Sequence, residues 1–421
     1  MLQKSTLAVI NINRHFNLAP AEYFALGGEV KAKLTIAVAG DYASKIYYLC
    51  RPGATKQATH HAQNDAHMDI DEIYYEAIDL LKAMIATPRV SREENEVAGV
   101  VEHHMRAWGM SPKRSGNNLW CMPPDFDPAK PTVLLNAHLD TVKPVEGWKH
   151  DPYTPTQEGG RIYGLGSNDD GASVVSLMAA HRMLAGHEQP CNFIFLASAE
   201  EEVSGKDGIE MVLPMLPRID VALVGEPTGM NPAIAEKGLM VLDAVVHGVA
   251  GHAARNEGVN AIYLAVDAIN KLRHLEWEKV SPTLGPVKVT VTKIEAGQQH
   301  NIVPDVCKML IDVRTTDAYT NAETLQLLRE AVPGCALTPH STRLNPSSID
   351  ASHPLVQRAV MLGKEPFGSP TLSDQALMPF PSLKMGPGQS SRSHTADEYI
   401  ECDEVREAID TYIVLLNGLH L

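Results

Sequence analysis

Apolar residues follow two distinct patterns between residues 68 and 238. Short continuous apolar runs, which are typical of buried strands in a parallel sheet, occupy 132–137, 192–197 and 220–224. Segments whose apolar residues recur at helical spacing predict helices at 73–85, 91–109 and 171–184. A capping box from Ser91 to Glu94 is expected to begin the second of these helices. Alternating strands and helices predict an α/β domain with a mainly parallel sheet.

The pattern changes after Gly238 and takes the order β-α-β-β-α-β. Strands are predicted at 239–247, 287–294, 306–313 and 336–340, and helices at 262–272 and 321–332. This is the order of a ferredoxin-like domain, so we expect an inserted domain, after which the chain rejoins the first sheet. The predicted domains are an N-terminal extension of unknown role (1–67), an α/β domain in two parts (68–238 and 343–421) and the inserted domain (239–342).

Composition narrows the classes of partner. The 421 residues are 44% hydrophobic and 21% charged, as in ordinary soluble proteins, and the net charge is −15. This negative charge disfavours nucleic acid and anionic membranes as partners. No apolar run reaches the roughly 18 residues of a membrane span, and we expect no signal peptide from Met1 to Leu18. The six cysteines are scattered, which favours reduced thiols and a cytoplasmic protein.

The central apolar run ends in a histidine and an aspartate, His138 and Asp140. Residues two apart on a strand point to the same face, and parallel sheets bind ligands beyond the carboxyl ends of their strands. The imidazole could therefore bind a metal ion while the carboxylate holds its second nitrogen. A single histidine in this position is more often structural, so the hypothesis depends on further ligands.

Further acidic residues and a histidine follow other predicted strands and turns. They are Asp169, Asp170, Glu200, Glu201, Glu202, Glu226 and His394. Acidic pairs on surface turns are common, but all of these positions fall at the carboxyl ends of one predicted sheet. Two histidines and three carboxylates suit two zinc-like ions with one bridging carboxylate. Such a pair can activate water and stabilise an oxyanion, with one acid left free as a general base.

Seven segments of the chain carry a more specific signal. In order, they read NAHLDTV, GLGSNDD, SAEEEVSG, VGEPTG, GHAARNEGVNA, HNIVPD with IDVR, and GPGQSSRSHTADEY. Together they resemble the M20 metallopeptidase/amidohydrolase family, and the residues within the motifs are most similar to those of its N-acylornithine deacylases. The resemblance implies a mainly parallel α/β di-metal hydrolase domain with an inserted ferredoxin-like (βαββαβ) lid and dimerisation domain. A homodimer through the inserted domain is then expected.

The resemblance also implies a set of metal ligands. His138 and Glu226 would hold one divalent ion, Glu202 and His394 the other, and Asp169 would bridge them. Zinc is the expected metal, with cobalt and manganese also compatible with these ligands. The family's cis peptide bond after the bridging aspartate is expected between Asp169 and the residue that follows it.

A general base and a supporting residue complete this set. Asp140 would orient the ligand histidine, and Glu201 would deprotonate the attacking water. A shift of one residue in matching AEEEVS would instead make Glu200 the base and Glu201 a ligand, and the sequence leaves this alternative open.

The resemblance assigns substrate contacts to the inserted domain. His252 would reach the partner subunit's site and polarise the scissile carbonyl, while Asn301 and Arg314 would hold the substrate. His252 could equally be an ordinary turn residue, and Arg314 could simply pair with Asp312 on its own strand. Arg255 lies in the same segment as His252 and is a further candidate for a substrate carboxylate.

The expected reaction is removal of an acetyl or succinyl group from an N-acyl amino acid, with N-acylornithine in arginine biosynthesis as the leading substrate. Arg392, directly before the last motif's histidine, could bind the second carboxylate of a succinyl group, or could be a solvated loop residue. Succinyl-diaminopimelate desuccinylase and an M20 dipeptidase or carboxypeptidase are the alternatives. A non-catalytic binding protein would be expected to lack at least one ligand, and none is missing.

Overall fold

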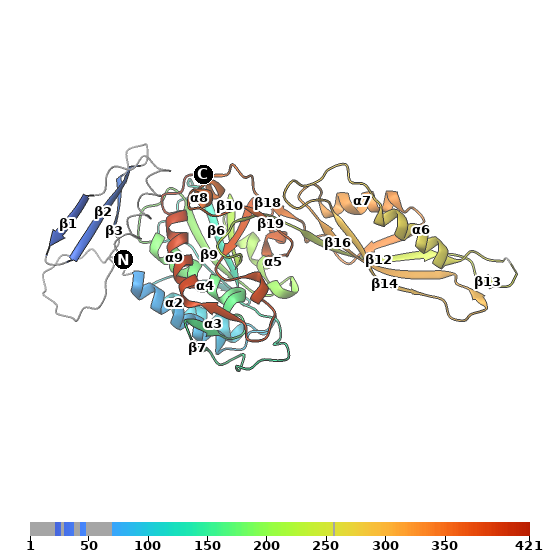
Figure 1. Ribbon diagram of the computed structural model, residues 1–421, viewed down its shortest axis with the longest axis horizontal. Coiled ribbons are helices and arrows are strands. Elements are labelled where there is room, and N and C mark those ends of the chain that lie inside the picture. Colours follow the sequence, from blue (N-terminus) through green and yellow to red (C-terminus); the bar gives the residue numbers. More distant parts are fainter. Residues whose placement is uncertain (1–21, 27–28, 38–42, 48–69, 256) are drawn as a thin grey trace. The chain divides into compact units, whose positions relative to one another are not determined.

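The computed structural model describes residues 22–26, 29–37, 43–47, 70–255 and 257–421 (Figure 1). The chain forms two compact units, Met1–Ala66 and His67–Leu421. In the first unit, β1 (Glu22–Leu26), β2 (Glu29–Ala37) and β3 (Ala43–Tyr47) form an antiparallel sheet. Most of the predicted extension 1–67 lies outside the described residues, so its role stays a prediction, as do the other domain boundaries.

The described part of the second unit is built on a nine-stranded mixed sheet in the order β18-β11-β20-β10-β6-β9-β5-β4, with β19 paired to β11. The bounds of these strands are β4 (Lys113–Ser115), β5 (Asn118–Cys121), β6 (Thr132–His138), β9 (Asn192–Ser198), β10 (Val221–Pro227), β11 (Ala233–Glu236), β18 (Ser347–Ser348), β19 (Phe367–Ser369) and β20 (Ser382–Gly386). The four central strands, β20, β10, β6 and β9, are parallel. This confirms the predicted α/β class, and β20 confirms that the C-terminal part rejoins the sheet.

Both faces of the central sheet are buried, which explains why its strands are continuous apolar runs. Val133 and Leu135 belong to the core beneath the larger helices, whereas Leu134 belongs to a smaller core on the opposite face, with residues of α5. The helices of this α/β domain are α2 (Ile70–Ile85), α3 (Asn95–Ala107), α4 (Ala172–Leu184), α5 (Ile209–Val212), α8 (Pro354–Met361) and α9 (Cys402–Leu416). All seven residues of β6 are buried, so its end is held rigidly.

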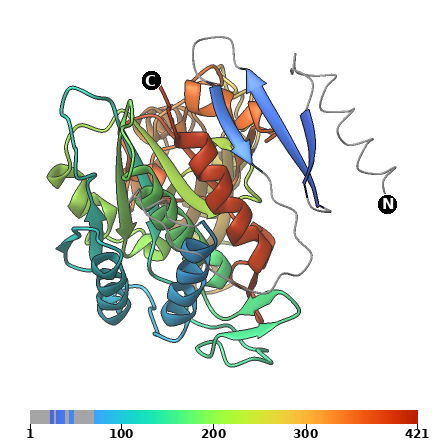
Figure 2. The same cartoon turned by 90° about the vertical axis from the view of Figure 1, so that its left-hand side faces the viewer.

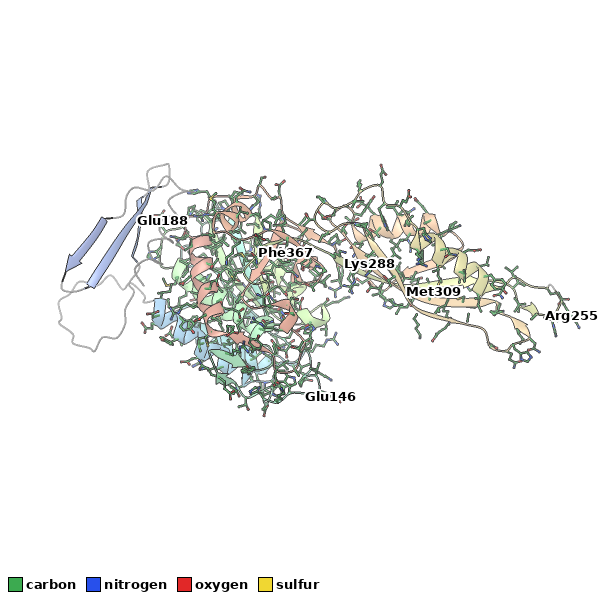
Figure 3. The ribbon with its side chains drawn as sticks, viewed as in Figure 1. Glu146, Glu188, Arg255, Lys288, Met309 and Phe367 are labelled. Carbon is green, nitrogen blue, oxygen red and sulfur yellow. The ribbon has the colours of Figure 1, made fainter. Side chains whose placement is uncertain are left out.

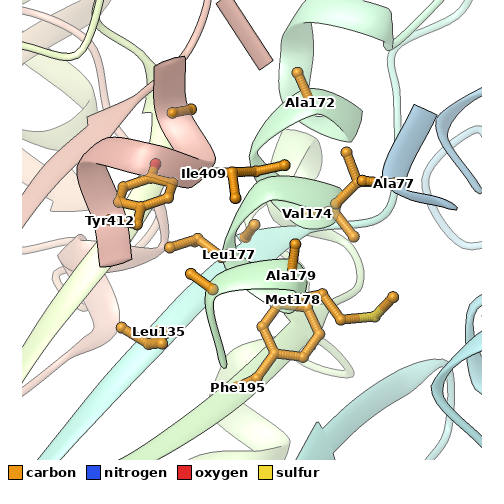
Figure 4. Close-up of a cluster of buried hydrophobic side chains, with 14 of the residues drawn as sticks. Ala77, Leu135, Ala172, Val174, Leu177, Met178, Ala179, Phe195, Ile409 and Tyr412 are labelled. Carbon is orange, nitrogen blue, oxygen red and sulfur yellow. The ribbon is translucent and has the colours of Figure 1, made fainter. Parts of the chain in front are cut away.

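Helix α4 lies at the centre of the larger core. Its Val174, Leu177 and Met178 lie between Leu135 and Phe195 of the sheet and the helices α2 and α9 (Figure 4). Helix α9 lies across the front of this layer in Figure 2. Burial of each large apolar side chain contributes about 1.5–3 kcal/mol, so this layer fixes the start of α4 directly after the Asp169 segment.

A smaller antiparallel sheet joins distant parts of the chain. Its strands are β7 (Thr156–Glu158), β8 (Arg161–Tyr163) and β21 (Tyr399–Glu401), in the order β21-β8-β7. The backbone N–H of Gly164 also donates to the carbonyl of Glu398 at 3.0 Å. The segment after β20 is thereby held against the segment before α4.

The region after β11 forms a second sheet with the predicted βαββαβ order. Its elements are β12 (Gly238–His247), α6 (Ala261–Arg273), β14 (Lys288–Ala296), β16 (Val306–Thr315), α7 (Asn321–Ala331) and β17 (Cys335–Pro339). The strands are antiparallel in the order β14-β16-β12-β17, and a two-stranded ribbon of β13 (Gly251–His252) and β15 (Ile302–Val303) projects from it. This is the arrangement expected for the inserted domain.

The predicted capping box of α3 is absent. Ser91 donates its hydroxyl hydrogen to Oδ2 of Asp140 at 2.7 Å, and the N-cap residue of α3 is Glu94, whose side chain does not cap the helix. Oε1 of Glu94 instead accepts from the backbone N–H of Glu200 at 3.2 Å. The prediction was wrong because these polar side chains form hydrogen bonds at the ends of β6 and β9.

No helix in the described residues is long and apolar enough to cross a membrane.

Candidate metal centre

Strand β6 delivers the first candidate ligand, His138, which is 2% exposed. Its Nδ1 lies 3.0 Å from the backbone oxygen of Asp140 and 3.5 Å from Oδ1 of the same residue. Its Nε2 lies 3.1 Å from Oδ1 of Asp169 and 3.8 Å from Oε2 of Glu201. Burial opposes protonation, but hydrogen bonds to Asp140 and Asp169 outweigh it and raise the pKa of His138 well above its usual range. One nitrogen is therefore held by Asp140, and the other faces acidic side chains, as a metal ligand would.

The segment before α4 positions Asp169. The carboxylate of Glu398 accepts three backbone hydrogen bonds from it, from Gly166 at 3.0 Å and from Asn168 and Asp169 at 2.9 Å each. The peptide bond between Asp169 and Asp170 is cis, as the family resemblance predicted. Asp169 thus projects from a segment whose backbone is fixed by a residue near the other end of the chain.

The three glutamates after β9 point in different directions. Glu201 and Glu202 begin a short 3-10 turn (Glu201–Val203), and both line a cavity of about 410 Å³. Glu200 has φ +56° and lies 3.9 Å from Nε of Arg92. Glu200 is not among the residues of the described chain that line this cavity. This geometry favours Glu201 over Glu200 for a role in the cavity.

Two further candidates approach from β10 and from the segment after β20. Glu226 lies near the end of β10 and lines the same cavity. Nε2 of His394 lies 3.0 Å from the Glu202 carboxylate and 3.7 Å from Oδ2 of Asp169. The hydrogen bond to Glu202 raises the pKa of His394 to about 8. All five predicted ligands therefore converge on one end of the sheet.

The donor set fits divalent metal ions. Two groups of side chains could each hold an ion, and within each group the ligand atoms lie within 4.8 Å of one another. The groups are His138 with Asp169 and Glu202, and His138 with Glu201 and Glu226. Burial raises the pKa of Glu201 well above its usual range and that of Glu226 to about 8. Buried carboxylates gathered in this way disfavour their own ionised form, and cations would relieve that cost. Imidazole and carboxylate donors are suited to zinc, cobalt or manganese.

The cavity of about 410 Å³ is lined by Asp169, Glu201, Glu202, Glu226 and His394. The buried His138 is not among the described lining residues, and its Nε2 contacts Asp169. The other walls of the cavity combine apolar and hydroxyl-bearing residues, which are Pro227, Thr228, Phe367, Ser369, Pro370, Thr371, Leu372, Ser390 and Ser393. Lys384 also lines the cavity, but its Nζ lies 2.8 Å from Oε2 of Glu236 and donates to Oγ1 of Thr371 at 2.9 Å. The cavity therefore combines candidate metal ligands with apolar and hydroxyl-bearing side chains, which suit a small, partly polar substrate.

Several residues of this centre were not predicted. Asp374 is buried, accepts from the Ser198 hydroxyl at 2.6 Å, and has a pKa raised by burial to about 6. Glu398 lies in the quoted motif GPGQSSRSHTADEY, and this placement was the only sequence signal for it. Arg89 and Lys384 are buried cations beside the acidic cluster, and their burial could not be read from isolated residues.

The predicted arginine contacts lie elsewhere. Nη1 of Arg392 donates to Oε2 of Glu404 at 2.6 Å, and its guanidinium lies 4.5 Å from the centre of the Tyr399 ring. Arg314 forms two hydrogen bonds with Asp312, of 2.9 and 3.1 Å, which is its predicted alternative. Neither arginine is among the described residues that line the cavity.

The remaining inserted-domain candidates gather on the ribbon of β13 and β15. Nδ1 of His252 accepts from the backbone N–H of Ala254 at 3.2 Å, in a turn, and Asn301 directly precedes β15. Arg255 lies at the tip of the inserted domain, at the end away from Lys288 (Figure 3). The structure groups these residues with one another, and none is among the described residues that line the cavity.

Comparisons with known proteins agree with this architecture. The sequence model of the family described as Peptidase family M20/M25/M40 matches residues 134–417. Among solved structures, aminopeptidase PepT from Bacillus cereus is 18% identical with a TM-score of 0.66, and the match covers 82% of this chain and 98% of that chain. The M20 metallo-carboxypeptidase Sso-CP2 from Sulfolobus solfataricus is 17% identical, with coverages of 82% and 99% and a TM-score of 0.59.

A third solved structure is the YXEP protein of Bacillus subtilis, described as a dinuclear metal binding peptidase of the M20 family. It is 15% identical, with coverages of 82% and 98% and a TM-score of 0.62. At these identities, the structural matches show a shared fold, while the match to the family model covers most of the chain.

Proposed function

The chain belongs to peptidase family M20/M25/M40, and from this membership we propose that it is a metal-dependent hydrolase that removes the acyl group from an N-acyl amino acid. The family acts on amide and peptide bonds, so the proposal concerns which amide is cleaved and which residues cleave it. The observation that carries it is a pair of donor groups that share His138 and whose carboxylates line one cavity of about 410 Å³.

We assign the ligands as the family resemblance implied, with His138 and Glu226 at one ion, Glu202 and His394 at the other, and Asp169 between them. The short distances of His138 to Asp169 and of His394 to Glu202 support this assignment. Bound divalent ions would polarise the scissile carbonyl and lower the pKa of water.

Glu201 is proposed to move the proton. It lines the cavity, and its pKa is raised by burial and by the neighbouring carboxylates Glu226 and Asp374. In its ionised form, a carboxylate with a raised pKa can accept the proton of the attacking water and, once protonated, return it to the leaving amine nitrogen. Water then supplies one hydroxyl group to the acid product and one proton to the amine product. Asp140 is a positioning residue in this scheme.

The leading substrate is N-acetylornithine or N-succinylornithine, as expected for an enzyme of arginine biosynthesis. The residues of the seven motifs, which resemble those of N-acylornithine deacylases, support an N-acyl amino acid as substrate. The cavity volume is within the range of small-molecule sites. A dipeptide or a peptide with a free carboxyl end is the second candidate, which the names of PepT and Sso-CP2 favour. Succinyl-diaminopimelate is the third.

A substrate panel tests this proposal. Zinc-loaded protein is offered the two N-acylornithines, succinyl-diaminopimelate and a set of dipeptides, and the released amine is measured. Faster turnover of the N-acylornithines supports the deacylase, whereas faster turnover of dipeptides identifies a peptidase. The Glu201→Gln variant shows whether any observed turnover belongs to this cavity.

The contribution of Arg392 needs its own comparison. To bind a succinyl carboxylate, its guanidinium has to exchange Glu404 for the substrate. If it does so, Arg392→Ala lowers the rate with the succinyl substrate more than with the acetyl substrate. An unchanged ratio removes Arg392 from the substrate site.

We also propose a homodimer through the inserted domain, with His252, Arg255, Asn301 and Arg314 acting on substrate in the assembled dimer. Strand β14 is an edge strand of its sheet, and edge strands with exposed apolar side chains are suited to association. A cytoplasmic location is proposed from the cysteines, because the five described ones are buried and free of disulfides.

A further inference from the structure

Arg89 is the largest fully buried side chain of the described residues, at 1% exposure. It follows α2, and its backbone carbonyl accepts from the N–H of Thr141 at 2.9 Å. Its backbone is thus held beside the residues that follow β6. Burial lowers the pKa of Arg89 to about 10, a value at which the guanidinium stays protonated near neutral pH.

The guanidinium ties together two ligand-bearing segments. Nη1 donates to the carbonyl of Leu139 at 3.1 Å, between His138 and Asp140, and Nη2 donates to the carbonyl of Gly166 at 2.7 Å, at the start of the Asp169 segment. Gly166 has φ +74°, and a Cβ there would lie 2.3 Å from Nη2. The glycine is required both by its conformation and by the space that the guanidinium occupies.

The charge of Arg89 is not neutralised by contact. Within the described residues, no carboxylate oxygen lies within 4.0 Å of its guanidinium, and Nε has no hydrogen-bond partner. The carboxylates that act on it electrostatically are Glu398, Asp140, Asp170 and Asp169, all at or beside the candidate metal centre. Lys384, the other buried cation, is different because it is paired directly with Glu236 at 2.8 Å.

We propose that Arg89 is a positioning residue that acts as a permanent internal counter-cation of the metal centre. While metal is absent, its charge stabilises the gathered carboxylates, and its two hydrogen bonds hold their segments at a fixed separation. Because the same charge repels a divalent cation, Arg89 also weakens metal binding. This inference rests on the proposed metal centre, and it adds a residue that sets how tightly that centre holds its ions and how stable it is without them.

The test compares Arg89→Met with the matched control Arg358→Met. Arg358 also donates to two backbone carbonyls, of Leu415 and Asn417, at 2.8 Å each, but lies between α8 and α9. For each protein, thermal unfolding is recorded after chelation and with saturating Zn²⁺, and the Zn²⁺ Kd is measured by competition with a chelating indicator.

Arg89→Met is expected to lower the Tm of the metal-free protein more than that of the zinc-loaded protein. By thermodynamic linkage, its Zn²⁺ Kd must then fall, by about tenfold for a coupling of ordinary size. Arg358→Met is expected to lower both Tm values equally and to leave the Kd unchanged. Equal Tm losses in Arg89→Met, or a Kd that stays the same or rises, would overturn the proposal.

Arg89→Lys keeps the charge but replaces the planar fork by a single ammonium group. It is expected to retain a Kd near that of the wild type, and a Kd as tight as that of Arg89→Met contradicts the counter-cation. If Arg89→Met folds only with zinc, the lysine variant supplies the comparison of Kd values. A wild-type protein that binds no divalent metal would refute the proposed metal centre itself, which is a separate outcome.

Discussion

Oδ1 of Asp140 accepts a hydrogen bond from the backbone N–H of Glu201 at 3.0 Å. Oδ2 accepts from the N–H of Glu202 at 3.1 Å and from the Ser91 hydroxyl at 2.7 Å. Since Asp140 also lies beside Nδ1 of His138, a single carboxylate aligns a ligand of one strand with the acidic turn of the next. The proposed base and two proposed ligands are therefore oriented by the same group.

Replacement of the proposed base gives the most direct prediction. Glu201→Gln should keep the cavity shape but lose proton transfer, so we expect kcat to fall by about 10²–10⁴-fold with the metal content unchanged. Metal analysis and steady-state kinetics of the purified variant measure both. Glu200→Gln is the control and should stay near wild-type turnover. A loss of metal in Glu201→Gln would instead make Glu201 a ligand.

Replacement of Asp140 should act through its neighbours. Asp140→Asn keeps the size of the side chain but removes its charge and one acceptor, so His138 and the Glu201 turn lose their alignment. We expect metal affinity to fall about 10–100-fold, as for other residues that orient ligands. Ser91→Ala removes only one of the hydrogen bonds to Asp140 and should have a smaller effect. Unchanged affinity in Asp140→Asn would show that the alignment is unimportant.

Metal removal should affect both activity and stability. Chelation should abolish turnover, and adding back Zn²⁺, Co²⁺ or Mn²⁺ should restore it to different extents. A ligand at 100 times its Kd stabilises the folded state by about 2.7 kcal/mol, so calorimetry should show a Tm that rises with metal concentration. Turnover that persists after metal content has fallen to zero would exclude metal-dependent hydrolysis.

Acid stability should depend on His181, which lies on α4 and is 1% exposed. Burial lowers its pKa to about 4, from the ordinary value of about 6.5. Below pH 6.5, His181 therefore binds a proton in the unfolded chain but stays neutral in the folded protein. Its contribution to the free energy of unfolding is complete above this pH and is lost as the pH falls toward 4. The shift corresponds to about 3 kcal/mol of unfolding free energy.

His181→Leu should accordingly flatten the pH dependence of unfolding between pH 6.5 and 4. Urea titrations of both proteins, in the presence of a chelator, measure this difference. His103→Leu, at an exposed position, is the control for histidine replacement. Parallel pH curves for wild type and His181→Leu would contradict the prediction.

Disruption of the proposed dimer should be possible on the edge strand β14. Ile294 is 50% exposed there, and Ile294→Asp places a charge in the proposed interface. Light scattering should show a fall from dimer to monomer mass, and turnover should fall with it because His252 would no longer reach the partner subunit's site. Tyr75→Asp, at a tyrosine of α2 that is 62% exposed, should change neither. A monomeric wild-type protein with full activity would contradict both the proposed dimer and the proposed role of His252 in the partner subunit's site.

The sequence predicted the fold where a local pattern matched the final environment. The run at 132–137 was read correctly as a buried strand because both faces of β6 are covered, and the spacing of the inserted domain gave its βαββαβ order. Ser91 was misread as a helix cap because a capping pattern shows which residues could bond, whereas the fold brings Asp140 within 2.7 Å of its hydroxyl.

The same distinction applies to the candidate site. His138, Glu202 and Glu226 could be placed because the ends of buried strands are visible in the sequence, whereas Asp169 and His394 were placed by the motifs of the family resemblance. Arg392 could not be placed in this way, since its direction depends on Glu404 and Tyr399, which follow it in the chain. Arg89 and Asp374 carry no motif, and only tertiary packing shows that their charges lie beside the cluster.

The Glu398 carboxylate accepts three backbone hydrogen bonds from the Asp169 segment, and this has a consequence for when the candidate site can form during protein synthesis. His138, Asp169, Glu202 and Glu226 are translated first, whereas His394 and Glu398 follow only after the whole inserted domain. Until the segment 386–401 has left the ribosome, the early ligands lack both their last partner and the carboxylate that holds the Asp169 backbone. The candidate metal centre can therefore be completed only after the C-terminal segment has been synthesised and has docked.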